Sequence, residues 1–85
     1  MRTNNVALQG VINKGLELMS SASVTEVQYD NWLNYSRTIL SMISRNPSIM
    51  ANYLSVILTA NNPNLRIYQR ISICLRYLIG IQNLI

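Results

Sequence analysis

Apolar residues recur every three or four positions along most of the chain, and no useful length alternates with the two-residue period of a strand. This periodicity restricts the fold to helices packed on helices. A length of 85 residues is typical of one domain, so we expect residues 1–85 to form a single unit. We predict an all-α fold, a compact four-helix bundle whose short connections make neighbouring helices antiparallel.

Two Asn-Pro pairs indicate where helices begin. Asparagine is a good N-cap, and proline fits the first helical position because its missing N–H would be unpaired there anyway. We therefore expect helices to start at Pro47 and Pro63. Upstream, the pair Ser23–Glu26 has the spacing of a capping box. The predicted helices span residues 3–20, 25–45, 47–60 and 63–85.

The predicted helix 47–60 has the broadest apolar face and carries no charge. A helix that is apolar on most sides is usually buried, so we expect this third helix to be central, surrounded by the others. Its apolar residues, which cover well over half of its circumference, are Ile49, Met50, Tyr53, Leu54, Val56, Ile57 and Leu58.

The apolar sides of the other helices supply the rest of the predicted core. Gly15 falls within the apolar side of the first helix, so we expect a neighbouring backbone to approach closely there. The predicted core residues are Leu8, Val11, Ile12, Leu16, Leu18 and Met19 in helix 3–20, Tyr29, Trp32, Leu33, Tyr35, Ile39, Leu40, Met42 and Ile43 in helix 25–45, and Ile67, Tyr68, Ile71, Cys74, Leu75, Leu78, Ile79, Ile81 and Ile85 in helix 63–85.

The net charge of +4 comes entirely from the second half of the chain. Basic and acidic residues cancel in residues 1–42, whereas residues 43–85 contain arginines and no acid. Arginine favours planar, bidentate contacts with carboxylate or phosphate groups. A footprint for nonspecific DNA binding normally carries more positive charge and more lysine than this chain does.

Catalytic chemistry finds little support in the composition. There is no histidine, which removes the commonest general base and metal ligand. Cys74 therefore has no imidazole to activate it, and its place on the apolar side of a helix predicts a small buried side chain. Neither a phosphate-binding glycine loop nor zinc-ligand spacing occurs. We expect no enzyme, no cofactor and no metal.

The last helix carries the candidate contact face, which consists of Arg66, Arg70, Ile73, Arg76 and Tyr77. Arginine and aromatic residues dominate binding hot spots, and apolar groups beside arginine are typical of an interface. Two interpretations of Arg66 and Arg70, four residues apart, stay open. They bind a carboxylate or phosphate of a partner, or they form a solvated helix face that Glu17, Glu26 or Asp30 partly neutralises.

These features predict a non-enzymatic protein-interaction module, a stoichiometric adaptor or inhibitor that also forms a homo-oligomer. The excess of apolar residues, 49% in a small chain, is the argument for self-association. Two alternatives are a small nucleic-acid-binding regulator and an oligomer that captures a phosphorylated small ligand between paired arginines. A single cysteine and the lack of a bilayer-spanning apolar run favour the cytoplasm and no membrane. Abundant asparagine and isoleucine suit the AT-rich genome of a phage, mobile element or low-GC bacterium.

Overall fold

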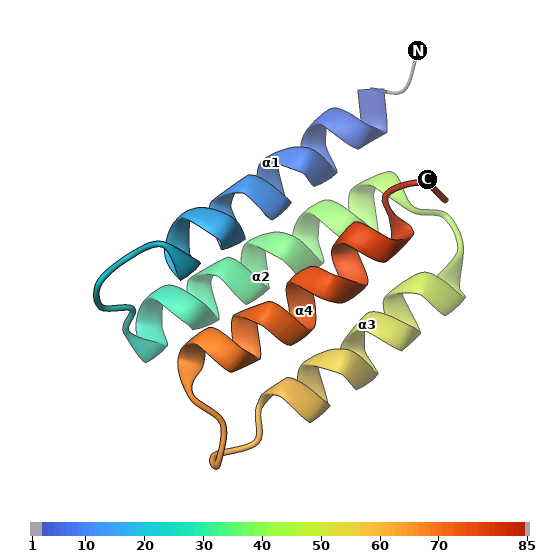
Figure 1. The fold of residues 1–85 in the computed structure, drawn as a ribbon. Helices are drawn as coiled ribbons and strands as arrows, with labels where there is room; N and C mark the ends of the chain where they lie inside the picture. Colours follow the sequence, from blue (N-terminus) through green and yellow to red (C-terminus); the bar gives the residue numbers. More distant parts are fainter. Residues whose placement is uncertain (1–2, 85) are drawn as a thin grey trace.

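The computed structural model describes residues 3–84, with side chains from residue 6 onward, and shows a bundle of helices (Figure 1). The helices are α1 (Thr3–Met19), α2 (Glu26–Ile43), α3 (Pro47–Ala60) and α4 (Ile67–Ile81), and no strand occurs in the described range. The Cα radius of gyration, 12.3 Å, is close to the value of about 12 Å expected for a compact domain of this length. The predicted all-α class is confirmed.

The helices pack mainly as α1 on α2, α3 on α4 and α1 on α4. In Figure 1, α4 runs in front of α2, with α1 on one side and α3 on the other. Helices α2 and α4 each contact all three other helices, whereas α3 has no contact with α1 within the described residues. The predicted central position of helix 47–60 is therefore not confirmed.

Helix α3 begins at Pro47, as its Asn-Pro pair predicts. The Asn46 Oδ1 atom accepts a hydrogen bond from the Ser48 N–H at 2.9 Å, which satisfies one of the free donors at the helix start. The backbone before Pro47 is extended, and the side-chain cap fixes the direction in which α3 leaves α2. This short connection places α2 and α3 antiparallel.

The start of α2 is displaced from the predicted capping box at Ser23–Glu26. Thr25 and Gln28 form the box instead: Thr25 Oγ1 accepts from the Gln28 N–H at 3.1 Å, and Gln28 Oε1 accepts from the Thr25 N–H at 3.0 Å. With Thr25 as the cap, Val24 and Tyr29 occupy the two positions of a hydrophobic staple, and both lie in or against the core. The packing of these two apolar side chains explains why the capping box forms at Thr25–Gln28 and not at Ser23–Glu26, which has the same spacing.

The predicted start of α4 at Pro63 is wrong, because α4 begins at Ile67. Asn62 Oδ1 accepts from the Asn64 N–H at 2.9 Å, and Asn62 O accepts from the Leu65 N–H at 3.0 Å. Proline fits the second position of such a turn as well as it fits a helix start. The second Asn-Pro pair therefore closes a turn between α3 and α4.

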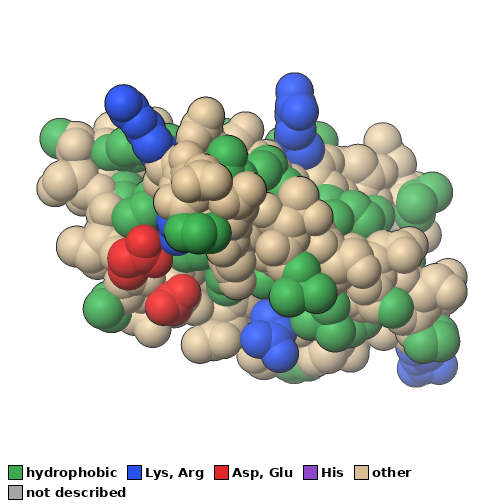
Figure 2. Space-filling view, turned by 90° about the horizontal axis from the view of Figure 1, so that it is seen from below, with side chains coloured by type: hydrophobic (Ala, Val, Ile, Leu, Met, Phe, Trp, Pro, Cys, Tyr) green, Lys and Arg blue, Asp and Glu red, His purple; other side chains and the backbone are tan. Residues whose placement is uncertain are grey.

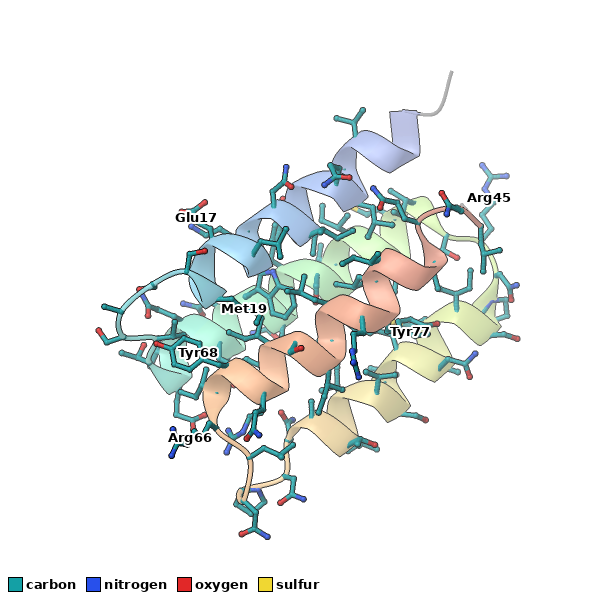
Figure 3. All side chains as sticks on the ribbon, in the orientation of Figure 1. Glu17, Met19, Arg45, Arg66, Tyr68 and Tyr77 are labelled. Atoms are coloured by element: carbon teal, nitrogen blue, oxygen red, sulfur yellow. The ribbon has the colours of Figure 1, made fainter. Side chains whose placement is uncertain are left out.

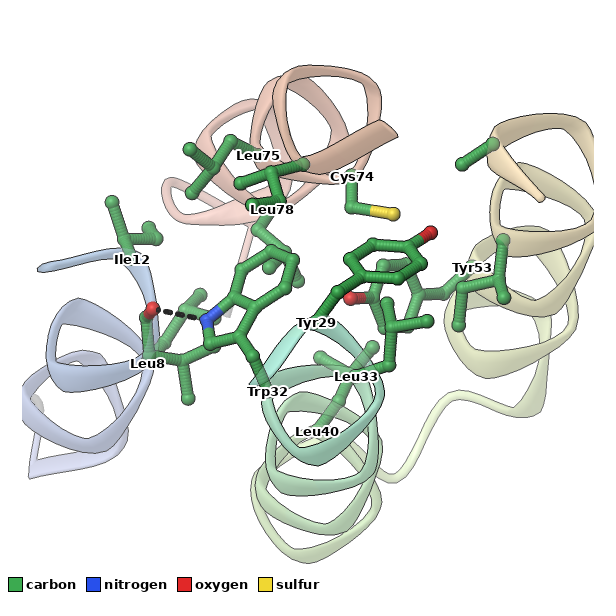
Figure 4. Packing of buried hydrophobic residues seen from close by; sticks show 14 of the residues in the cluster. Leu8, Ile12, Tyr29, Trp32, Leu33, Leu40, Tyr53, Cys74, Leu75 and Leu78 are labelled. Atoms are coloured by element: carbon green, nitrogen blue, oxygen red, sulfur yellow. Dashed lines mark hydrogen bonds between the residues drawn. The ribbon is translucent and has the colours of Figure 1, made fainter. Parts of the chain in front are cut away.

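The core is built around Trp32, whose indole lies between α1 and α4 (Figure 4). Its Nε1–H donates to the Val11 carbonyl oxygen at 3.0 Å, so the one polar atom of the ring is satisfied. A Cβ on Gly15 would lie 2.7 Å from Trp32 Cζ2 and 2.8 Å from Leu75 Cδ2. The close approach expected at Gly15 is thus made by side chains and not by a neighbouring backbone.

Several residues predicted for the core lie at the surface. Leu58 is 77% exposed and Met42 is 74% exposed. The apolar faces of α2 and α3, which carry these two residues, are wider than the area that the neighbouring helices cover. The outer edge of each face is therefore in contact with solvent. The predicted core residues that the structure exposes are Leu16, Tyr35, Met42, Leu54, Leu58 and Ile79, and Ile85 lies outside the described residues. Within the described residues, no helix has both the length and the apolar character needed to cross a membrane.

We expect Gly15→Ala to lower the free energy of unfolding by up to about 2 kcal/mol. The gain in helix propensity is about 1 kcal/mol, but overpacking against a rigid indole costs about 1–3 kcal/mol. Gly80, also in a helix, has no atom within 4 Å of an added Cβ, so Gly80→Ala should raise stability by up to about 1 kcal/mol. Chemical denaturation of both variants measures the contrast, and equal shifts would contradict the packing at Gly15.

Candidate interaction surface

A polar cluster, most of it buried, joins α2 to α3. The Ser36 hydroxyl donates to the Leu33 carbonyl oxygen at 2.7 Å and lies 2.6 Å from the Tyr53 hydroxyl. The Tyr29 hydroxyl donates to Asn61 Oδ1 at 2.8 Å. Every buried side-chain nitrogen and oxygen in the described part of the chain has a partner. Buried polar groups that are fully paired specify one arrangement of the helices, so we assign this cluster a structural role.

Cys74 lies beside this cluster and is fully buried, as the sequence predicts. Burial raises the pKa of its thiol from 9.0 to about 11, and hydrogen bonding with Tyr29 and Tyr53 only partly offsets that effect. Burial also raises the pKa values of Tyr29 and Tyr53 above their ordinary value of 10.0. A protonated thiol in the core is a poor nucleophile.

Arg70, a member of the predicted contact face, is engaged inside the bundle. Its Nη1 atom lies 3.1 and 3.2 Å from the two carboxylate oxygens of Glu26, and its Nε–H donates to the Leu65 carbonyl oxygen at 3.2 Å. Its guanidinium carbon also lies 6.0 Å from the centroid of the Tyr29 ring. The Arg70 side chain is only 13% exposed, so it ties α4 to α2. Glu17, Glu26 and Asp30 were the predicted acidic partners of the arginines, and of these Glu26 pairs with Arg70.

Ile73 and Tyr77 are half-buried and pack against the core. The Tyr77 ring stacks on Tyr53, with ring centroids 5.6 Å apart and planes 11° apart. Its hydroxyl donates to the Ile49 carbonyl oxygen at 2.8 Å, and burial raises its pKa. Figure 3 shows Tyr77 on the side of α4 that faces α3. These two side chains hold the bundle together.

Arg66 and Arg76 are the exposed members of the predicted face. Arg66 is the N-cap residue of α4 and lies where the α3–α4 connection enters α4 (Figure 3). Ten residues of helix separate them, which corresponds to about 15 Å along the axis. Figure 2 shows basic side chains well apart from one another on the face that it presents, and acidic side chains gathered at one end. The structure therefore divides the predicted face into two separated cations and three side chains with intramolecular contacts.

Two grooves flank α2. The larger, of about 530 Å³, lies between α1 and α2, and its lining includes Trp32 and the Lys14–Glu17 ion pair at 3.4 Å. Both side chains of that pair are mostly exposed, so the pair contributes little to stability. The second groove, of about 480 Å³, lies between α2 and α3. Arg37, Met50 and Leu54 are among its lining residues.

An exposed apolar stripe on α3, next to the second groove, escaped the sequence-based prediction. The stripe consists of Pro47, Ala51, Leu54 and Leu58, all exposed. Its spacing of four, three and four residues places the four on one helix face. The sequence contains this signal, but the assumption that helix 47–60 is central assigned Leu54 and Leu58 to the core. We use the name α3 stripe for these four residues below.

The bundle exposes this stripe although its core is closed. The accessible surface of 5402 Å² is close to the value of about 5100 Å² expected for a monomeric protein of 9.7 kDa. Association is therefore not needed to cover an open core. Scattered apolar residues at a surface are ordinary, whereas these four lie on a single helix face, so the α3 stripe is a candidate contact surface.

The described residues contain no group of three His, Cys, Asp or Glu side chains that could hold a metal ion. No family model, curated protein or solved structure matches the chain.

We expect Arg70→Ala to lower the free energy of unfolding by about 1–2 kcal/mol, since it removes the hydrogen bond to Leu65 and the packing over Tyr29. The ion pair with Glu26 adds little, because that carboxylate is 61% exposed. Arg66→Ala is the matched control, and its exposed side chain should leave stability within about 0.5 kcal/mol. Urea denaturation compares the two, and an equal effect would show that Arg70 is not structural.

Stability should fall as pH rises from about 9 to 11. The unfolded chain loses the Cys74 proton near 9.0 and the folded protein near 11, so unfolding releases a proton in this window. Below pH 9 the contribution of Cys74 is fully present. In Cys74→Ala the free energy of unfolding should fall less steeply with pH just above pH 9. Above pH 10 it should still fall, because the pKa values of Tyr29 and Tyr53 are raised as well. Denaturation midpoints across this range test it, and an unchanged slope in Cys74→Ala would contradict the assignment.

Proposed function

We propose that the protein is a non-enzymatic protein-interaction module that associates with itself and acts stoichiometrically, by recruiting or blocking a partner protein. The observation that carries this proposal is the exposed α3 stripe beside the α2–α3 groove of a bundle whose core is closed. A contiguous apolar surface rimmed by polar residues is typical of a protein contact site.

The arginines supply the polar part of this proposed surface. Arg37 lines the α2–α3 groove, and no acidic side chain in the described residues pairs with it. Arg66 and Arg76 project from α4 as further exposed cations. In this proposal they form the rim and favour partners with acidic surface, while Arg70, Ile73 and Tyr77 hold α4 in place for them.

The two other functions that the arginines suggested have less support. A clamp for a phosphorylated ligand needs two guanidinium groups directed at one site, but Glu26 occupies Arg70 and leaves Arg66 alone. A nucleic-acid surface needs a continuous positive stripe, whereas the basic side chains in Figure 2 stand apart. We propose a cytoplasmic location because the one cysteine is a free thiol.

The mass of the wild-type protein in solution tests this proposal. We expect light scattering, from micromolar to millimolar concentration, to show a rise from 9.7 kDa to about twice that mass. Because the association is mainly apolar, added salt should change the midpoint little. A protein that keeps the monomer mass throughout would contradict self-association, and steep loss of binding to duplex DNA with salt would favour the nucleic-acid alternative.

A further inference from the structure

The groove between α1 and α2 is the larger of the two that flank α2, and the proposed protein contact does not use it. Its volume of about 530 Å³ lies within the range of about 300–1,000 Å³ that is usual for small-molecule sites. Glu17, which lines the groove, projects from the side of α1 that faces away from α4 (Figure 3). None of the lining residues belongs to the α3 stripe.

Two amide side chains in the lining have their oxygen atoms already bound. Gln82 Nε2–H donates to Gln9 Oε1, and Gln9 Nε2–H donates to Asn13 Oδ1 at 2.9 Å. On α2, Gln28 Oε1 accepts the Thr25 N–H at 3.0 Å as part of the capping box. The amide nitrogens of Asn13 and Gln28 have no hydrogen-bond partner among the described residues. Both amides therefore offer N–H donors to a ligand, which selects for acceptor oxygens.

Apolar and aromatic side chains form another part of the lining. Trp32 and Leu18 are buried at the groove, whereas Tyr35 is 43% exposed. A tyrosine ring supplies a flat contact area at small cost in conformational entropy, because it has only two side-chain torsions. This part of the groove therefore favours a ligand with a flat ring.

Gly10 leaves space in the groove beside the Tyr35 ring. It lies in the middle of α1, where glycine weakens a helix relative to alanine. An added Cβ would lie 3.7 Å from the Tyr35 hydroxyl oxygen, which is an ordinary contact. Packing therefore does not require glycine at this position, in contrast to Gly15. Because Gly10 lines the groove, a larger side chain there would occupy the space of a ligand.

The charges in the groove balance each other. Lys14 and Glu17 are its only charged lining residues, and they form an ion pair at 3.4 Å. An ionic ligand would lose hydration in the groove without gaining an unpaired counterion there. The lining therefore favours an uncharged ligand.

We propose that the groove between α1 and α2 binds an uncharged, flat ring compound that carries carbonyl oxygens. The ring lies against Tyr35 in the space beside Gly10, and the carbonyl oxygens accept hydrogen bonds from the amides of Asn13 and Gln28. This site goes beyond the proposed protein contact and does not depend on self-association, since all of its lining residues come from one chain.

Caffeine is a suitable probe, because it is uncharged and flat, carries carbonyl oxygens and has no N–H donor of its own. We expect a dissociation constant of about 1 mM or lower. In nuclear magnetic resonance spectra, the side-chain N–H2 signals of Asn13 and Gln28 should shift on titration. The same ring system without carbonyl oxygens, 9-methylpurine, should bind about fivefold more weakly. No shift of these signals at about 10 mM caffeine, or equal affinity for 9-methylpurine, would overturn the proposal.

Two near-isosteric variants test the amide donors. Asn13→Asp and Gln28→Glu remove the N–H groups but keep the side-chain oxygens that hold these residues in place. Each should raise the dissociation constant of caffeine about fivefold, while the denaturation midpoint stays near that of the wild type. Asn34→Asp, in the groove on the other side of α2, is the matched control and should leave the affinity unchanged. Equal affinities in the three variants would show that these amides are not the donors.

A groove-filling variant tests the position of the ligand. Leucine favours a helix more than glycine does, so Gly10→Leu should stay folded while its side chain displaces caffeine. Unchanged caffeine affinity in Gly10→Leu would place the ligand elsewhere and overturn the proposal. Theophylline-7-acetate, which adds a carboxylate to the same ring, tests the charge of the ligand. It should bind more weakly than caffeine, and equal or tighter binding would contradict the assignment to uncharged compounds.

Discussion

The contact between the Trp32 indole and the backbone of α1 at Gly15 is the constraint on which the arrangement of three helices depends. A ring this large fits between α1 and α4 only because residue 15 has no side chain. Its N–H binds the Val11 carbonyl, so burial of the ring leaves no polar atom unpaired. The spacing of α1, α2 and α4 follows from one indole, and Leu75 closes the same site from α4.

The other half of the bundle is held by polar as well as apolar contacts. Ser36 and Tyr53 join α2 to α3, Tyr77 joins α4 to α3, and Arg70 joins α4 to α2. The two bonds that reach α3, at Tyr53 and Ile49, lie on its inner or lateral sides. That helix is consequently well anchored from within and bare on its outer side, which is why its apolar stripe stays accessible.

The sequence predicted the elements better than their arrangement. The start of α3 follows from local chemistry, since Asn46 and Pro47 act within one turn. The same dipeptide at Asn62 closes a turn, because proline suits both structures and only the packing of α4 decides. The broad apolar face of α3 suggested a central helix, although part of that breadth faces solvent.

The candidate contact residues, too, could be predicted only in part from the sequence. Arg66 and Arg70 are equivalent in sequence, one helical turn apart, and only the position of Glu26 on a different helix separates a structural arginine from an exposed one. The partners of Tyr77 on α3, Tyr53 and Ile49, could not be identified without the fold. The spacing of the α3 stripe, by contrast, was present in the sequence and became interpretable once the outer side of α3 was located.

The connectivity of the bundle also bears on the order in which it assembles. Two of its main helix contacts, α1 with α2 and α3 with α4, join segments that are adjacent along the chain. Such hairpins close short loops at small entropic cost and form rapidly. The contact of α1 with α4 joins opposite ends of the polypeptide and includes a hydrogen bond from Gln82 to Gln9. Because the contact between α1 and α4 closes the longest loop, we expect it to form more slowly than the contacts within the two hairpins.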